Sequence, residues 1–297
     1  MKRFFLAIAL FATMAVSINA QLLWRVTAPS DTTVASSYLV GTHHIAPAGM
    51  IDSISGLREA ISEVSTVYGE LDMSELSTPQ GRQLMMKYIV APADSTLDKV
   101  LTPAQIDSVN TILKTYTGMD GLVSQMLSLV PAVAETQIGA LQTMKALPGF
   151  DASQQLDMQI QTIAASLGKK IAGLETPDFQ YRALFGIPVS LQAQSLMKSV
   201  RMDDVAVQKA AELADKYLAG DLDGMMEVMN DPATGMDEHT AKRLIDDRNQ
   251  AWADILIGAI PTASVLVAVG AGHLPGVNGL IAKLRDAGFK VDPVGIK

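Results

Sequence analysis

The chain has no cysteine and few histidines, and both scarcities limit its chemistry. Without cysteine, neither disulfide bonds nor thiolate metal ligands are available, so the fold must depend on its hydrophobic core. The four histidines are His43, His44, His239 and His273. Because imidazole is a common metal ligand and proton carrier near neutral pH, these positions are considered first for a functional site.

After residue 20 the chain also lacks a long hydrophobic run, and it has no excess of positive charge. No run of about eighteen apolar residues occurs there, so no membrane span is expected. The net charge is −8, and it becomes −10 without Lys2 and Arg3. Nucleic acids and anionic membranes bind basic surfaces, so neither partner is expected.

Residues 1–20 have the features of a secretory signal peptide. Lys2 and Arg3 give a basic start, residues 4–16 are apolar, and Ala20 suits a cleavage site. The mature chain is expected to begin at about Gln21 and to be periplasmic or secreted. No cysteine follows, so a lipid anchor is not expected, and an uncleaved N-terminal anchor is the alternative.

Four short, mostly apolar segments predict buried strands. They span residues 37–40, 66–69, 170–174 and 264–269, and residues 289–294 could add an edge strand. Helical stretches separate them, including a long helical insertion at about residues 78–166. This alternation predicts one α/β domain over residues 21–297, with a central, largely parallel sheet and helices on both faces.

Threonine followed by proline marks three predicted helix starts, at Thr78, Thr102 and Thr176. The threonine hydroxyl can cap the helix, and proline fits the first helical position. Gln105 lies three residues after Thr102, which predicts a capping box.

The motif V-G-x-x-H-[I/L] occurs twice, at residues 40–45 and 269–274. Each copy follows a predicted strand, and each places a histidine just after it, His44 or His273. Ligands in open α/β sheets bind beyond the carboxyl ends of the strands, so the pair predicts a shared site. The alternative for each is a hydrogen-bonded structural histidine. His43 is expected to be a neighbour of the site or a surface residue.

Two glutamates also follow predicted strands. Glu70 would complete a two-histidine, one-carboxylate set that suits a divalent metal ion, and Asp72 could point the same way. The alternative for Glu70 is a helix cap. Glu175 could be a further ligand, a general base, or a carboxylate favoured by the helix that follows it.

Arg248 and Asn249 lie on a predicted helix, where Arg248 shares a face with Trp252. An arginine there could bind a substrate carboxylate or stabilise an oxyanion. The spacing alone favours a solvated helix face with local pairing between arginine and aspartate.

With these residues in this order, the chain resembles the TraB/PrgY/GumN family, which includes the Tiki ectodomains. The anchors cover nearly the whole mature chain, at residues 37–44, 69–72, 173–176, 248–249 and 270–273. The resemblance implies a fold similar to erythromycin-esterase-like and ChaN-like domains, and metal-dependent peptide hydrolysis with manganese or cobalt. It also implies a metal and catalytic centre of His44, Glu70 and His273, supported by Arg248 and Asn249.

The resulting hypothesis is a secreted or periplasmic metallohydrolase that acts on a peptide or protein substrate. Manganese or cobalt is expected as the cofactor, with zinc as a further option. The ion would activate water and polarise a carbonyl, and Glu175 or a nearby carboxylate could move the proton. The alternative is a non-catalytic protein that captures a peptide or pheromone-like ligand in the same pocket. A metal or haem handler is a third option, from fold analogy alone.

Overall fold

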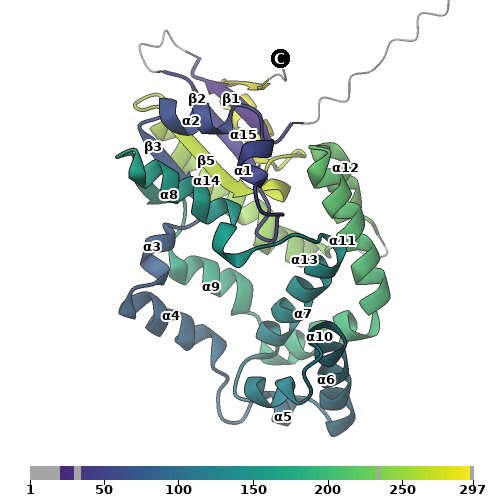
Figure 1. Ribbon diagram of the computed structural model, residues 1–297. Coiled ribbons are helices and arrows are strands. Elements are labelled where there is room, and N and C mark those ends of the chain that lie inside the picture. The colour runs from purple at the N-terminus through teal and green to yellow at the C-terminus, as the bar shows by residue number, and fades with distance from the viewer. Residues whose placement is uncertain (1–20, 30–34, 233–234, 295–297) are drawn as a thin grey trace, which may run out of the picture.

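The computed structural model describes residues 21–29, 35–232 and 235–294, which form a six-stranded sheet with a helical region beside it (Figure 1). The predicted signal peptide lies outside these residues. The strands are β1 (Leu23–Thr27), β2 (Ser37–Thr42), β3 (Thr66–Gly69), β4 (Lys170–Gly173), β5 (Val265–Gly270) and β6 (Lys290–Pro293). Their order in the sheet is β4-β3-β5-β2-β1-β6.

The four predicted strands form the parallel part of the sheet, β4-β3-β5-β2. The prediction that all four are buried is wrong for β4, which lies at the sheet edge with exposed or half-buried residues. β1 and β6 complete the sheet in antiparallel pairings, and β6 occupies the edge predicted for residues 289–294. β1 was not predicted. Its sequence mixes buried leucine and valine with the exposed Arg25, as suits a strand in the antiparallel part of a sheet. The prediction of a largely parallel α/β fold is confirmed.

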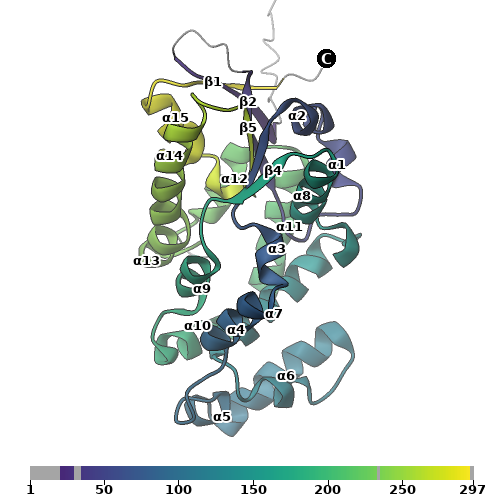
Figure 2. The ribbon, with the colours of Figure 1, turned by 90° about the vertical axis from the view of Figure 1, so that its left-hand side faces the viewer.

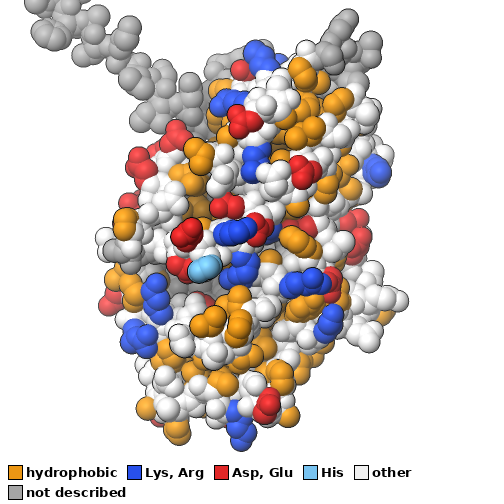
Figure 3. Space-filling view, turned by 180° about the vertical axis from the view of Figure 1, so that it is seen from behind, with side chains coloured by type: hydrophobic (Ala, Val, Ile, Leu, Met, Phe, Trp, Pro, Cys, Tyr) orange, Lys and Arg blue, Asp and Glu red, His pale blue; other side chains and the backbone are white. Residues whose placement is uncertain are grey.

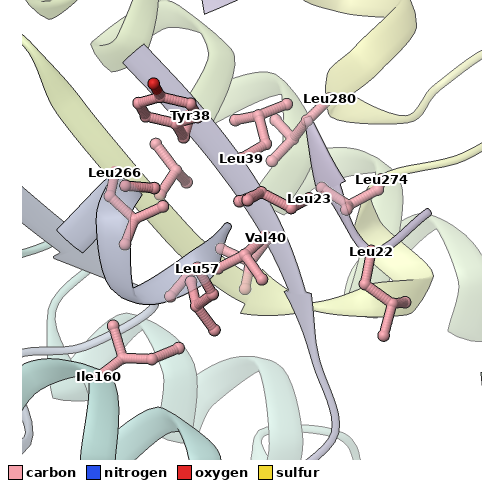
Figure 4. Packing of buried hydrophobic residues seen from close by; sticks show 14 of the residues in the cluster. Leu22, Leu23, Tyr38, Leu39, Val40, Leu57, Ile160, Leu266, Leu274 and Leu280 are labelled. Atoms are coloured by element: carbon pink, nitrogen blue, oxygen red, sulfur yellow. The ribbon is translucent and has the colours of Figure 1, made fainter. Parts of the chain in front are cut away.

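Helices cover both faces of the sheet. Figure 2 shows α14 (Asp247–Ala259) and α15 (Leu280–Asp286) on one side, and α1 (Met50–Ser53), α2 (Leu57–Glu63) and α8 (Leu156–Ser166) on the other. Every residue of β2 is therefore buried. Successive side chains of a strand point to opposite faces. Leu39 accordingly lies against Leu280, and Val40 lies against Leu57 (Figure 4).

The segment between β3 and β4 consists of helices joined by loops over its described length, with isolated bridges at Val90, Leu129 and Phe150. Before α8, its elements are α3 (Met73–Leu76), α4 (Pro79–Ile89), α5 (Leu97–Val100), α6 (Pro103–Thr117), η1 (Leu122–Met126), α7 (Pro131–Ala146) and η2 (Ala152–Gln154). α8 packs on the sheet, whereas α5, α6 and α7 build a second core with α10. The predicted insertion is therefore not one packing unit, because its last helix, α8, belongs to the core at the sheet.

A second helical stretch joins β4 to β5. It contains α9 (Pro177–Phe185), α10 (Val189–Arg201), α11 (Asp203–Leu218), α12 (Leu222–Met229), α13 (Glu238–Ala241) and the π-helical turn η3 (Lys242–Asp246), which leads into α14. After β5, the short η4 (Ala271–His273) precedes α15. Within the described ranges, no helix combines the length and the apolar character needed to cross a membrane.

All three predicted threonine caps are present. Thr78, Thr102 and Thr176 accept hydrogen bonds from backbone N–H groups at the starts of α4, α6 and α9. At α6 the capping box is complete, because Gln105 also accepts from the backbone N–H of Thr102. The helix ends at Gly118, whose φ of 73° is the left-handed conformation that glycine adopts without strain.

Replacing Thr102 with alanine should destabilise the protein by about 1 kcal/mol, because α6 loses its capping hydroxyl. Urea unfolding measures the change. Thr96 is the matched control, since it also precedes a helix but its side chain caps no backbone N–H. Equal destabilisation by Thr96→Ala and Thr102→Ala would contradict the capping argument.

Candidate active site

The two copies of the repeated motif end at the same edge of the sheet. β2 and β5 are parallel neighbours, and Thr42 pairs with Gly270 at their carboxyl ends. His44 follows β2 by two residues, and His273 lies in η4 directly after β5. The register of one strand pair therefore brings together two segments that are more than 200 residues apart.

A pair of glycines lets two glutamates lie side by side. Gly69 and Gly173 are opposite each other at the ends of β3 and β4. A Cβ at Gly69 would lie 2.3 Å from Gln161 Nε2, and a Cβ at Gly173 would lie 2.8 Å from the Glu175 carbonyl oxygen. Glycine thus allows the chain to fold closely over both strand ends. There the Glu175 N–H donates to the Glu70 carbonyl at 3.0 Å.

Arg248 lies between these two carboxylates and is only 6% exposed. Its Nη2 donates to Glu70 Oε2 at 2.5 Å and to Glu175 Oε1 at 2.8 Å, and its Nε donates to Glu175 Oε2 at 3.1 Å. Trp252 packs against the guanidinium and donates to Glu175 Oε2 at 3.2 Å. The interpretation of a solvated helix face is therefore wrong. This face of α14 packs toward the sheet, and there Arg248 contacts the two glutamates.

Glu70 is held as a buried anion. Burial by itself raises the pKa of the carboxyl group, but Arg248, the neighbouring imidazoles and the Gly270 N–H outweigh it and lower the pKa to about 2. The Gly270 N–H donates to Oε1 at 2.9 Å. The helix-cap alternative does not apply to Glu70, because Asp72 caps α3 instead.

Asn249 orients His273, which is 5% exposed. The amide of Asn249 donates to the carbonyls of His273 and Asn278, so its Oδ1 is free to accept from His273 Nδ1 at 2.7 Å. This network assigns the proton to Nδ1. Nε2 then accepts from Arg248 Nη1 at 3.1 Å, and Glu70 Oε1 lies 3.9 Å away. Burial lowers the pKa of His273 to about 4, so the ring is neutral.

Asp157 orients His44 at the opposite side of Glu70. His44 Nδ1 lies 3.0 Å from Asp157 Oδ2, and the Thr42 hydroxyl donates to the other carboxylate oxygen at 2.7 Å. The hydrogen bond and the charge of Asp157 raise the pKa of His44 to about 9. His43 does not contact Asp157 in this way. It accepts a hydrogen bond from the N–H of Ile45 and packs against the ring of Tyr217. Sequence reasoning missed Asp157, which lies on α8, 113 residues from His44, in a stretch without any motif.

His44 and Glu70 line one pocket of about 240 Å³, together with Asp157 and Gln180. Gln180 donates to Glu70 Oε2 at 3.3 Å and to Glu175 Oε1 at 3.0 Å. This volume lies below the usual range for drug-sized ligands, so it suits a side chain or a short part of a larger substrate. Glu70 thus lines the pocket and also contacts Arg248, which pairs with the buried Glu175.

The donor groups suit a divalent ion, although the described residues contain no group of three or more His, Asp and Glu side chains arranged to hold one. Arg248 explains this, because it contacts both Nε2 of His273 and an oxygen of Glu70. The chemistry of the donors nevertheless fits. His44 and His273 each have Nδ1 bound to an oxygen acceptor, so Nε2 would be the ligand atom, as is usual around metal sites. Binding of an ion would displace Arg248 from Nε2 of His273 and a proton from Nε2 of His44. The metal ion stays a prediction.

Replacing Asp157 with asparagine should lower the pKa of His44 from about 9 toward the ordinary 6.5, because the carboxylate charge is lost. NMR titration of the imidazole Cε1–H in metal-free protein measures this. The wild-type pKa is raised, so the His44 contribution to stability is complete below pH 6.5 and is lost as the pH rises through about 9. In Asp157→Asn, the stability should no longer fall as the pH rises from 6.5 to about 9. Asp107→Asn, on exposed α6, is the control, and an unchanged His44 pKa in Asp157→Asn would contradict the pairing.

Comparison with known proteins agrees with this arrangement at the level of the family. The family model described as the TraB/PrgY/gumN family matches residues 22–293, nearly the whole chain. No curated protein and no solved structure matches the chain. The match spans the repeated histidine motifs and every residue of the candidate site. The chain therefore belongs to the TraB/PrgY/gumN family.

Proposed function

We propose that the chain is a divalent-metal-dependent hydrolase that cleaves peptide bonds, and that His44, Glu70 and His273 would hold the ion. One observation carries the proposal. Two imidazoles from paired strand ends, each oriented through Nδ1, flank one ionised carboxylate at a pocket. Manganese or cobalt is the proposed ion, with zinc as a further option. When bound, it would lower the pKa of a water molecule and polarise the scissile carbonyl.

The other site residues would position these groups. Asp157 orients the ring of His44, and Asn249 keeps the proton of His273 on Nδ1. Glu175 was a candidate general base, but Arg248, Gln180 and the indole N–H already occupy its two oxygens. We therefore propose that Glu175 fixes Arg248. Arg248 would supply positive charge next to the carboxylate at the back of the pocket.

The proposed substrate is a peptide or a protein, and the proposed location is the periplasm or the extracellular medium. The location depends on the signal-peptide features of residues 1–20. The small pocket supports a substrate of which only one side chain or a short segment enters the site.

Turnover of a fluorogenic peptide library, with manganese, cobalt, zinc or a chelator, tests the function. His44→Ala and His273→Ala should each lower hydrolysis by about 100-fold, the scale of losing a metal ligand or a proton-transfer group. Glu75→Ala, at an exposed residue of α3 outside the pocket, is the control. Equal turnover in the wild type and both site variants would refute the proposal. Peptide binding without turnover, unaffected by the chelator, would favour the non-catalytic alternative.

A further inference from the structure

A second and larger concavity lies in the helical region, apart from the candidate active site. Its volume is about 1160 Å³, above the usual range for small-molecule sites. Residues of α5, α6 and α10 line one part of it, and residues of α13 and η3 line another. We call it the α10 groove. Figure 2 shows α10 and α13 on the same side of the molecule as α14.

The α10 groove is basic, although the chain has a net charge of −8. Lys198 and Arg201 line it from α10, and Arg243 lines it from η3. The close ion pairs in the described part of the chain involve other cations, although Asp237 and Glu135 act on Arg243 from farther away. Asp237, a carboxylate in the lining, is already bound to the N–H and hydroxyl of Thr240. On the face seen from behind, both basic and acidic side chains lie close to a histidine (Figure 3).

One face of α10 is exposed along its whole length. Leu191, Gln194, Lys198 and Arg201 recur at intervals of three or four residues and are all exposed. The opposite face, with Leu196 among its residues, is buried in the second core. The exposed stripe therefore begins with an aliphatic side chain that is 49% exposed and ends with two cations.

We propose that the α10 groove binds an acidic polypeptide segment that also carries aliphatic side chains. The cations match its carboxylates, and Ile187 and Leu191 match its aliphatic groups. Gln105 and Gln194 offer amide donors and acceptors to a peptide backbone. The lining contains no phenylalanine, tyrosine or tryptophan, the large rings on which proteins stack the bases of single-stranded nucleic acid, and its one aromatic side chain is the imidazole of His239. This chemistry favours a polypeptide.

The groove and the pocket are connected through one helix but share no lining residue. α9 carries Gln180 of the pocket and leads into Ile187 of the groove, and Arg243 donates to the Ala183 carbonyl of the same helix. A segment bound in the groove would thus lie beside the pocket and leave it open. The binding proposal does not depend on hydrolysis.

Fluorescence polarisation with three labelled peptides tests the proposal. The peptides share one leucine-containing scaffold and carry glutamate, lysine or serine at the same positions. Only the glutamate peptide should bind, and its affinity should fall as salt is raised, because exposed charges are screened. The double variant Lys198→Glu, Arg201→Glu should weaken binding by about tenfold or more. Lys170→Glu, a charge reversal at an exposed position at the start of β4, is the control and should bind normally.

Two further measurements keep the outcome unambiguous. The peptides are also bound to His44→Ala protein, so that cleavage cannot be mistaken for weak binding, and circular dichroism checks that the double variant is folded. Equal binding of the glutamate and lysine peptides would overturn the proposal. So would equal losses in the Lys170→Glu variant and the double variant. Tighter binding of a sulfated glycan or single-stranded RNA than of the glutamate peptide would overturn the choice of a polypeptide.

Discussion

Replacing Arg248 with methionine should destabilise the protein by about 3–5 kcal/mol, the cost of breaking a buried ion pair from one side. Methionine keeps much of the side-chain volume but removes the charge. Glu70 and Glu175 would then be two carboxylates with side chains 11% and 3% exposed, next to each other and without the guanidinium between them. Chemical unfolding measures the change. Arg58→Met, at an exposed arginine paired with Asp52, is the control and should change stability little.

The pH dependence of the Arg248→Met variant has a definite sign. In the wild type, the pKa of Glu70 is about 2, below the ordinary 4.5, so its contribution is present above pH 4.5 and is lost as the pH falls toward 2. Without the guanidinium, burial instead raises the pKa of this carboxyl group. The destabilisation should therefore be larger at about pH 7 than at about pH 4. Adding Glu175→Gln should restore part of the lost stability. A loss that is independent of pH and unchanged by Glu175→Gln would contradict the buried charge arrangement.

Replacing Glu70 with glutamine should abolish most of the hydrolytic activity and leave the fold intact. We expect a loss of about 100-fold or more in kcat/KM. The amide has the same shape as the carboxylate, but it carries no negative charge with which to bind a metal ion or accept a proton. The stability cost should be smaller than that of Arg248→Met, since Glu175 still pairs with Arg248. Peptide hydrolysis in the metal-supplemented assay measures the loss.

Glu75→Gln is the matched control for the Glu70 variant. Glu75 lies on exposed α3, five residues along the chain, and does not line the pocket. Full activity in Glu75→Gln, together with loss of activity and retained structure in Glu70→Gln, is the expected pattern. Wild-type kcat/KM in Glu70→Gln would show that this carboxylate takes no part in the reaction.

Local patterns in the sequence predicted most of the sheet. The strands β2 to β5 are short, mostly apolar segments followed by glycine or a polar residue, and in β2, β3 and β5 burial on both faces makes the apolar pattern continuous. The caps of α4, α6 and α9 were equally predictable, because the capping bond joins residues only three positions apart. β1 was missed, since its exposed residues interrupt the apolar pattern.

The candidate site was only partly predictable. That His44 and His273 would follow strands at one sheet edge came from a repeated motif and the rule for parallel strands. Their oriented Nδ1 atoms depend on Asp157, 113 residues from His44, and on Asn249, 24 residues from His273. Such partners have no local signature, because nothing in the sequence distinguishes them from the other aspartates and asparagines of the chain.

The sequence by itself determined β2 to β5, the helix caps, the family and the identity of the two histidines, since each of these depends on neighbouring residues or on a motif. The tertiary structure alone decided that Arg248 is buried between Glu70 and Glu175, and that α10 leaves a basic face uncovered. The bonds of Arg248 span 178 and 73 residues. Charges so distant in the chain meet only when packing of the sheet and its helices brings them together, and burial then gives their pairing its strength.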